Sequence, residues 1–307
     1  MHWIKRLLRA LKNPNLFARG ANRLYHRRFN KRKFNSDGIN VLDEDWDNLL
    51  ILDACRYDMF EANHELPGRL ESRISRGATT VEFLRGNFVG RELEDTVYVT
   101  ANPQLYRNRE HLLTEFHDVI NVWQRDGWND EHQTVLPETV NKYAREAADT
   151  YPNKRLIVHY IQPHYPFIGS QTQFDKNHLN VEDPQGEQVW DQLMTGKLKV
   201  SRESIWDLYV DNLLVALPHV EELMTTLQGK TVVTADHGNM VGDRASPIPI
   251  NEWGHPRGIY TEELVKVPWL VFVNGPRREI ESESPVNQVN DVEDSVVSDR
   301  LENLGYM

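Results

Sequence analysis

Residues with acidic and imidazole side chains follow directly after two apolar runs of the chain. NLLILD ends at Asp53, and TVVTADH ends at Asp236 and His237. Two carboxylates and one imidazole form a mixed oxygen and nitrogen donor set, which suits Mn, Zn or Mg better than a calcium cage. The pattern therefore predicts a divalent metal site, with one ion rather than two. The alternatives are that Asp53 caps the following helix and that Asp236 and His237 form an ordinary polar turn.

A hydroxyl nucleophile is indicated by SRGATTVEFL, in which Thr79 and Thr80 follow a glycine and precede a helical pattern. A hydroxyl at a helix N-terminus lies where backbone N–H groups and the helix dipole favour an anion. A coordinated metal would lower the pKa of such a hydroxyl, so either threonine can serve, and Thr80 is ranked above Thr79. Capping of the helix by a threonine is the alternative.

The segments that carry these residues belong to an alternation of short apolar runs and helical patterns. The predicted strands are 48–52, 96–100, 155–161, 231–235 and 268–273, and the predicted helices include 137–150 and 202–227. This alternation predicts a three-layer αβα sandwich around a mostly parallel sheet. Ligands bind just beyond the carboxyl ends of the strands in such a sheet, and Asp53, His164 and Asp236 all lie at predicted strand ends.

Length and composition limit the class of protein. The chain has 307 residues, of which 39% are apolar, enough to bury a full core. Its single cysteine, Cys55, excludes an internal disulfide framework and every zinc site built from several cysteines. No apolar stretch approaches the roughly 20 residues needed to cross a bilayer, so a cytoplasmic location is predicted.

Three units are predicted: a basic amphipathic segment over 1–35, a catalytic domain over 36–278 and an acidic tail over 279–307. The tail is read as a linker to residue 298, followed by RLENLGYM, which docks as a final helical turn.

The N-terminal segment is strongly basic. Residues 1–33 contain 11 of the 35 Lys and Arg residues and none of the 46 Asp and Glu residues. In MHWIKRLLRALK, Trp3 and three leucines share one helical face, which predicts peripheral binding to an anionic surface at the inner face of a membrane. Packing on the domain or on a partner subunit is the alternative. Pro14 and Gly20 predict a break into two short helices, and the acidic remainder of the chain argues against nucleic acid.

Five motifs together resemble the alkaline phosphatase superfamily, with the closest match to its sulfatase-like and lipoteichoic-acid-synthase-like branches. In chain order they are NLLILDACRYD, GATTVEFL, HYIQPHYPF, TADHGN and EWGHPRGIYTEELVKVPWLVF, spread over residues 48–273. Each motif alone is weak, but their order and spacing together are specific. The resemblance implies an alkaline-phosphatase-like fold and a metal-dependent enzyme acting on phosphate or sulfate esters.

The resemblance also implies roles for single residues. Asp53, Asp236 and His237 would be the metal ligands. Thr80 or Thr79 would be both a ligand and the nucleophile.

Two histidines and two arginines complete the site that the resemblance implies. Residues matching His164 and His255 would contact the charged group of the substrate or protonate the leaving oxygen, and in two-metal members they would hold a second ion. Arg56 and Arg257 share loops with proposed ligands and would clamp a phosphate oxygen, or else form surface ion pairs. His159, before the end of its predicted strand, is assigned to core packing.

The chain departs from true sulfatases at Cys55. Those enzymes convert a Cys or Ser in a C-x-P-x-R setting to formylglycine, whereas DACRYDMF lacks the proline and the spacing. An unmodified threonine suits phosphoester or phosphodiester chemistry better than sulfate ester cleavage. The prediction is a hydrolase or transferase of a phosphorylated or sulfated small molecule or glycan, in surface glycan or lipid-linked metabolism. The alternative is a non-catalytic scaffold protein of a membrane-associated glycan pathway.

Overall fold

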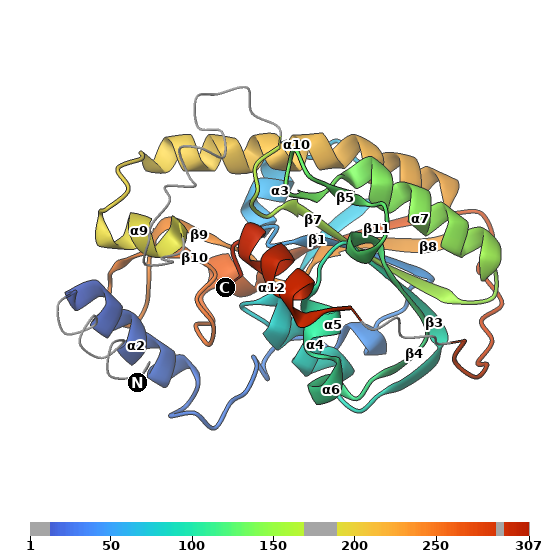
Figure 1. The fold of residues 1–307 in the computed structure, drawn as a ribbon, viewed down its shortest axis with the longest axis horizontal. Helices are drawn as coiled ribbons and strands as arrows, with labels where there is room; N and C mark the ends of the chain where they lie inside the picture. The colour runs from blue at the N-terminus through green and yellow to red at the C-terminus, as the bar shows by residue number, and fades with distance from the viewer. Residues whose placement is uncertain (1–12, 169–188, 287–291, 307) are drawn as a thin grey trace.

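A seven-stranded sheet forms the centre of the molecule (Figure 1). The computed structural model describes residues 13–168, 189–286 and 292–306. The sheet order is β2-β11-β8-β1-β7-β3-β4. The strands are β1 (Asn48–Asp53), β2 (Arg69–Ile74), β3 (Glu92–Thr100), β4 (Glu115–Asn121), β7 (Arg155–Pro163), β8 (Gly229–Ala235) and β11 (Lys266–Asn274). Strands β8, β1, β7, β3 and β4 run parallel, and β11 is antiparallel to β8 and β2, so the predicted mostly parallel sheet is confirmed.

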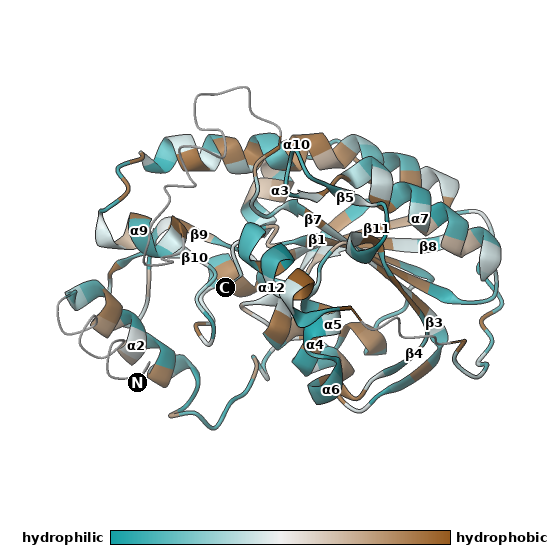
Figure 2. Ribbon diagram, viewed as in Figure 1, coloured by the Kyte–Doolittle hydropathy of each residue, from teal (hydrophilic) through white to brown (hydrophobic). Residues whose placement is uncertain are grey.

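Both faces of the sheet are buried, which is why its central strands read as continuous apolar runs. Along β1, Leu50 and Leu52 belong to one hydrophobic cluster and Leu49 and Ile51 to another, because successive side chains of a strand point to opposite faces. Helices α7 (Pro137–Thr150) and α10 (Arg202–Thr226) pack on each other and on β7, while α4 (Thr80–Phe88) contributes to the second cluster (Figure 1). Figure 2 shows hydrophobic and hydrophilic bands alternating along α7 and α10. The predicted three-layer fold is confirmed.

The remaining elements connect this framework. Short helices are α3 (Tyr57–Asn63), α5 (Gln104–Arg107), α6 (Arg109–Leu112), α9 (Val189–Thr195) and α11 (Glu262–Val265), with 3-10 turns η1 (Val41–Asp43) and η2 (Val122–Gln124). Two small antiparallel pairs join β9 (Met240–Arg244) to β10 (Asn251–Gly254) and β5 (Trp128–Asn129) to β6 (Thr134–Val135). Among the described helices, none combines the length and apolar character that crossing a membrane requires.

The N-terminal segment differs from its prediction. Helix α2 runs unbroken over Pro14–His26, so the expected break at Gly20 is wrong. Pro14 occupies the first turn, where a missing N–H costs nothing, and the Asn13 side chain caps the helix. A glycine inside a helix lowers helix stability by about 1 kcal/mol relative to alanine. Contacts between other residues of α2 and the domain offset this cost at Gly20. The amphipathic pattern predicted for residues 1–12 lies outside the described residues.

The C-terminal segment also differs from its prediction. Helix α12 (Asp294–Asn303) begins within the stretch that was expected to be a linker. Val297, Leu301 and Leu304 are buried in the larger hydrophobic cluster, so this segment is a packed part of the domain.

Candidate metal and nucleophile site

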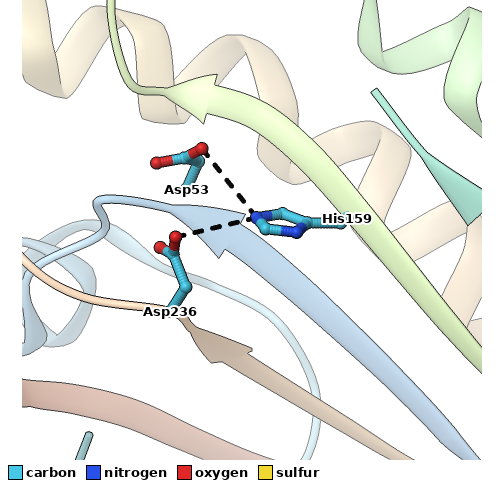
Figure 3. Close-up of side chains that lie close together, drawn as sticks. All are labelled: Asp53, His159 and Asp236. Atoms are coloured by element: carbon cyan, nitrogen blue, oxygen red, sulfur yellow. Dashed lines mark ion pairs between the residues drawn. The ribbon is translucent and has the colours of Figure 1, made fainter. Parts of the chain in front are cut away.

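Three strand ends meet at one edge of the sheet. Strand β1 pairs in parallel with β7 on one side and with β8 on the other, so their carboxyl ends converge. Asp53 ends β1, Asp236 follows β8, and His159 lies in the middle of β7, where it pairs with Ile51 of β1. Figure 3 shows their side chains pointing toward one another. One ligand atom from each lies within 4.8 Å of the other two, and all three residues are buried, so this cluster can hold a metal ion.

The Asp53 carboxylate has one oxygen held by the protein and one unpartnered. Oδ2 accepts hydrogen bonds from Asn102 Nδ2 at 2.6 Å and from the Tyr306 hydroxyl. Oδ1 is buried and no described residue hydrogen-bonds to it, but it lies 3.6 Å from His237 Nε2. Oδ1 is therefore the oxygen that Asp53 offers to a cation.

The Asp236 carboxylate is arranged in the same way. Oδ1 accepts from the backbone N–H groups of Ala54 at 3.0 Å and His237 at 2.8 Å. Ala54 reaches this contact with a φ of 58°, a left-handed conformation that costs a non-glycine residue about 1–2 kcal/mol. Oδ2 is buried without a hydrogen-bond partner among the described residues, 3.4 Å from His237 Nε2. A strained backbone thus fixes one oxygen and leaves the other for a ligand.

The His237 ring is oriented by its own loop. Nδ1 lies 2.7 Å from the carbonyl oxygen of Gly238, so Nδ1 carries the proton and donates it. Nε2 therefore presents a lone pair toward both aspartates, which is the arrangement found in metal-binding histidines. Any side chain at position 238 would collide with the backbone of Glu263, so only glycine lets this loop close.

The charges of the site favour a cation. Burial, together with the nearby Asp236 carboxylate, raises the pKa of Asp53 well above its ordinary value. Two ionised carboxylates in a buried site repel each other, and a divalent cation removes this cost. The unpartnered oxygens Asp53 Oδ1 and Asp236 Oδ2, with His237 Nε2 beside them, fit such an ion by type and position.

His159 was assigned to core packing from the sequence, and the structure gives it a further contact. Its Nδ1 lies 2.9 Å from the Tyr98 hydroxyl, and its Nε2 lies 3.8 Å from one oxygen of each aspartate (Figure 3). Burial lowers the pKa of His159 to about 4, so the ring is neutral near pH 7. The available signal was a lone imidazole inside an apolar strand that neighbours the Asp53 strand.

The two threonines of GATT have different positions. Thr79 is the N-cap of α4, and its hydroxyl accepts from the Glu82 N–H at 3.3 Å. Thr80 is the first residue of the helix and is buried, with its hydroxyl 3.4 Å from His237 Nε2. The geometry brings Thr80 to the cluster and gives Thr79 the capping role.

His164 and His255 form a pair beside the cluster. Their Nε2 atoms are 2.9 Å apart, and His164 Nδ1 lies 2.7 Å from the carbonyl oxygen of Tyr165. His164 Nδ1 therefore donates to that carbonyl, and His255 donates from Nε2 to His164 Nε2. Burial lowers the pKa of His164 to about 4 and that of His255 well below its ordinary value, so both rings are neutral. The centroid of the His255 ring lies 4.8 Å from that of His237.

The two arginines have other partners. Arg56 is buried and forms ion pairs with Asp58 at 2.6 Å and Asp243 at 2.7 Å. Arg257 is exposed, 3.9 Å from Glu82. These contacts favour the ion-pair alternative for Arg56, and the clamping role of both arginines stays a prediction.

Cys55 is fully buried, and burial raises the pKa of its thiol well above the ordinary value. A buried protonated thiol is a poor nucleophile, in agreement with the departure from sulfatases noted in the sequence.

Sequence reasoning missed two residues that touch the cluster. Asn102 follows β3 and donates to Asp53, and Tyr306 reaches the same carboxylate from the C-terminal segment. The Tyr306 ring stacks on His164, with centroids 4.8 Å apart and planes within 8°. Asn102 follows a predicted strand, which was an available signal, but no local pattern pointed from Tyr306 to the site.

Comparisons with known proteins find distant structural likenesses only. No protein-family model and no curated protein matches the chain. Similar solved structures include the soluble domain of lipooligosaccharide phosphoethanolamine transferase A from Neisseria meningitidis, 11% identical, with 73% of this chain and 75% of that chain covered and a TM-score of 0.44. The lipoteichoic acid synthase LtaP from Listeria monocytogenes is 11% identical, with 76% and 66% covered and a TM-score of 0.37.

A protein in the alkaline phosphatase superfamily from Vibrio parahaemolyticus is 11% identical, with 84% of this chain and 65% of that chain covered and a TM-score of 0.39. At these TM-scores and identities the likeness carries no argument about the family or the reaction.

Proposed function

We propose that the protein is a metal-dependent phosphoester or phosphodiester hydrolase or transferase with Thr80 as its nucleophile. The observation that carries this proposal is the position of the Thr80 hydroxyl, 3.4 Å from His237 Nε2 and beside two aspartates with unpartnered oxygens. Asp53, Asp236 and His237 would hold one Mn, Zn or Mg ion, with His159 next to it. Such an ion, when bound, acts as a Lewis acid on phosphoryl oxygens and lowers the pKa of a bound hydroxyl.

Thr80 lies where a negative charge on its oxygen is stabilised. It is the first residue of α4, at the end of the helix where backbone N–H groups and the helix dipole favour an anion. Thr80 loses its hydroxyl proton, Oγ1 forms a bond to phosphorus, and the bond from phosphorus to the leaving oxygen breaks; that oxygen departs with the electron pair and takes up a proton. Water or an acceptor hydroxyl then attacks phosphorus, the Oγ1–phosphorus bond breaks, and the threonine regains its proton.

His255 and His164 would act on the second step. His255 Nδ1 is buried, and no described residue hydrogen-bonds to it. Because the ring is neutral, this nitrogen would accept the proton of the incoming water or hydroxyl. His164 holds the other side of the ring through Nε2. Because both rings are neutral near pH 7, the proposal gives His255 the part of a proton acceptor in place of the acid that the resemblance implies.

A phosphorylated small molecule or glycan is the substrate class that this chemistry fits. Sulfate esters fit less well, because the chain offers an unmodified threonine and a buried thiol. A role in surface glycan or lipid-linked metabolism is part of the proposal.

An anionic membrane surface is the proposed partner of α2. This helix contacts the domain with its polar side: Arg19 pairs with buried Glu252, and Asn22 exchanges hydrogen bonds with Ile248 at 2.8 and 2.9 Å. Its apolar side faces outward, with Phe17 63% and Tyr25 54% exposed. An outward apolar face with basic residues beside it suits a membrane interface with anionic lipid, at the cytoplasmic side in this proposal.

Hydrolysis assays with a metal-loaded preparation test the catalytic proposal. We expect cleavage of bis-p-nitrophenyl phosphate or p-nitrophenyl phosphate in preference to p-nitrophenyl sulfate. Thr80→Ala should reduce the rate by at least about 100-fold, because it removes the nucleophile. Thr79→Ala, which removes the helix cap and costs about 1 kcal/mol of stability, should retain most activity.

Two outcomes would contradict this proposal. Equal activity in wild type and Thr80→Ala would exclude Thr80 as the nucleophile. If no ester is cleaved while vesicles or glycans are bound, the scaffold alternative is favoured.

A further inference from the structure

The C-terminal segment places one side chain against the candidate site. Helix α12 is anchored by Val297 and Leu301, which are 1% and 2% exposed. After the helix, the chain turns at Gly305, whose φ of 76° favours glycine, and the Tyr306 N–H bonds to the Leu301 carbonyl at 2.9 Å. Figure 1 shows α12 lying across the middle of the molecule. The position of Tyr306 is therefore fixed by packing and by a backbone turn.

The Tyr306 hydroxyl belongs to a small polar network. It donates to Asp53 Oδ2, accepts from Asn102 Nδ2 at 2.8 Å and lies 3.5 Å from the Thr80 hydroxyl. Asn102 also donates to the same Asp53 oxygen at 2.6 Å. The Tyr306 ring lies flat against His164. A single side chain thus touches the proposed ligand, the proposed nucleophile and the histidine pair.

We infer that Tyr306 is a positioning residue of the proposed active site, which holds Asp53 so that Oδ1 faces the cation. A carboxylate can rotate about its Cβ–Cγ bond, and two donors on Oδ2 hold it in the orientation in which Oδ1 faces the cluster. Groups that hold a metal ligand in this way orient it, and their loss lowers the affinity for the metal. The inference rests on the proposed function and adds a residue from a segment that carries none of the five motifs.

Binding of Mn²⁺ to the full chain tests this role without an activity assay. Tyr306→Phe keeps the ring on His164 and removes only the hydroxyl, so folding should be preserved, as circular dichroism can verify. The Kd for Mn²⁺ should rise by about 10- to 100-fold, the usual effect of losing a group that holds a metal ligand.

Tyr151→Phe is the matched control. It also removes a hydroxyl that donates to an aspartate, Asp118 at 2.9 Å, outside the candidate site. This variant should bind Mn²⁺ like the wild type.

A double-mutant cycle strengthens the test. Asn102→Ala and Tyr306→Phe remove the two donors to one oxygen, so their effects on the Kd should be non-additive.

Three results would overturn the inference. One is a Kd for Tyr306→Phe within about twofold of the wild type, while the wild type binds Mn²⁺ and cleaves phosphoesters; this leaves the proposed function standing. A second is an equal change in Tyr151→Phe. A wild type that binds no divalent cation would overturn the inference and the proposed function together.

Discussion

Two helices near the ends of the described chain, α2 and α12, pack on the same domain in different ways. Helix α2 contacts it with polar side chains, and α12 contacts it with apolar side chains. Helix α2 turns its charged and amide side chains inward, where Arg19 meets the buried Glu252, and leaves Phe17 and Tyr25 exposed. Helix α12 buries Val297 and Leu301 in the larger hydrophobic cluster. An apolar face turned outward is available to a partner, whereas one turned inward stabilises the fold.

The difference also separates two functions. The packing of α12 carries Tyr306 to the metal cluster, so this helix supports the site from within. The exposed apolar side of α2 is the surface proposed to bind the membrane. If this comparison is correct, replacing apolar residues of α12 should lower stability, whereas replacing the exposed apolar residues of α2 should lower membrane binding.

The largest loss of stability is expected from Arg19→Ala in α2. The substitution leaves the Glu252 carboxylate, which is 0% exposed, without its cation. Removing one partner of a buried pair costs about 3–5 kcal/mol of unfolding free energy. Arg32→Ala, which breaks an ion pair with the exposed Asp37, should cost about 1 kcal/mol or less. Urea denaturation measures both, and similar losses would show that polar contacts do not hold α2.

A slightly smaller loss is expected from Leu301→Ala in α12. Leu301 is 2% exposed, so truncation leaves a cavity and costs about 2–5 kcal/mol. Leu24→Ala in α2 is the same change at a residue that is 44% exposed, and it should cost about 0.5 kcal/mol or less. Thermal or urea unfolding of the two variants compares the faces directly. Equal losses of stability in the two variants would contradict the assignment of Leu301 to a buried face and of Leu24 to an exposed face.

The smallest effect on stability, with a clear effect on binding, is expected from the double variant Phe17→Ser and Leu24→Ser. Each exposed apolar side chain that enters a membrane contributes about 1.5–3 kcal/mol, so partitioning onto phosphatidylserine vesicles should fall at least about tenfold. Val273→Ser, at a residue that is 59% exposed on β11, should bind like the wild type. Vesicle sedimentation measures this. Unchanged binding would exclude α2 as the membrane contact, and a change only in the oligomeric state would indicate a second copy as its partner.

The sequence predicted the buried parts of the fold better than its edges. Strands β1, β7 and β8 were found because burial on both faces makes them continuous apolar runs. Strand β2 reads RLESRI and lies at the edge of the sheet, where polar side chains are tolerated, so no apolar run marked it. Helix α12 was missed over its first turns because its composition is mostly polar and acidic, which is typical of a linker.

In the candidate site too, residues on buried strands were predicted and a residue near the end of the described chain was not. Asp53, Asp236 and His237 follow apolar strands, so their convergence could be inferred from the topology of a parallel sheet. The choice between Thr79 and Thr80 required knowledge of which residue caps the helix. Tyr306 is separated from Asp53 by most of the chain, and its contact depends on the docking of α12, which no local pattern encodes.

Metal binding by the wild type and by Asp236→Asn tests the central claim, that Asp53, Asp236 and His237 surround one cation. Equilibrium dialysis against Mn²⁺ or Zn²⁺, followed by elemental analysis, measures the stoichiometry. The account predicts about one ion per chain for the wild type and a loss of that ion in Asp236→Asn, because the variant replaces the anionic oxygen that faces the site. Equal stoichiometry in the two proteins, or no bound ion in the wild type, would contradict it.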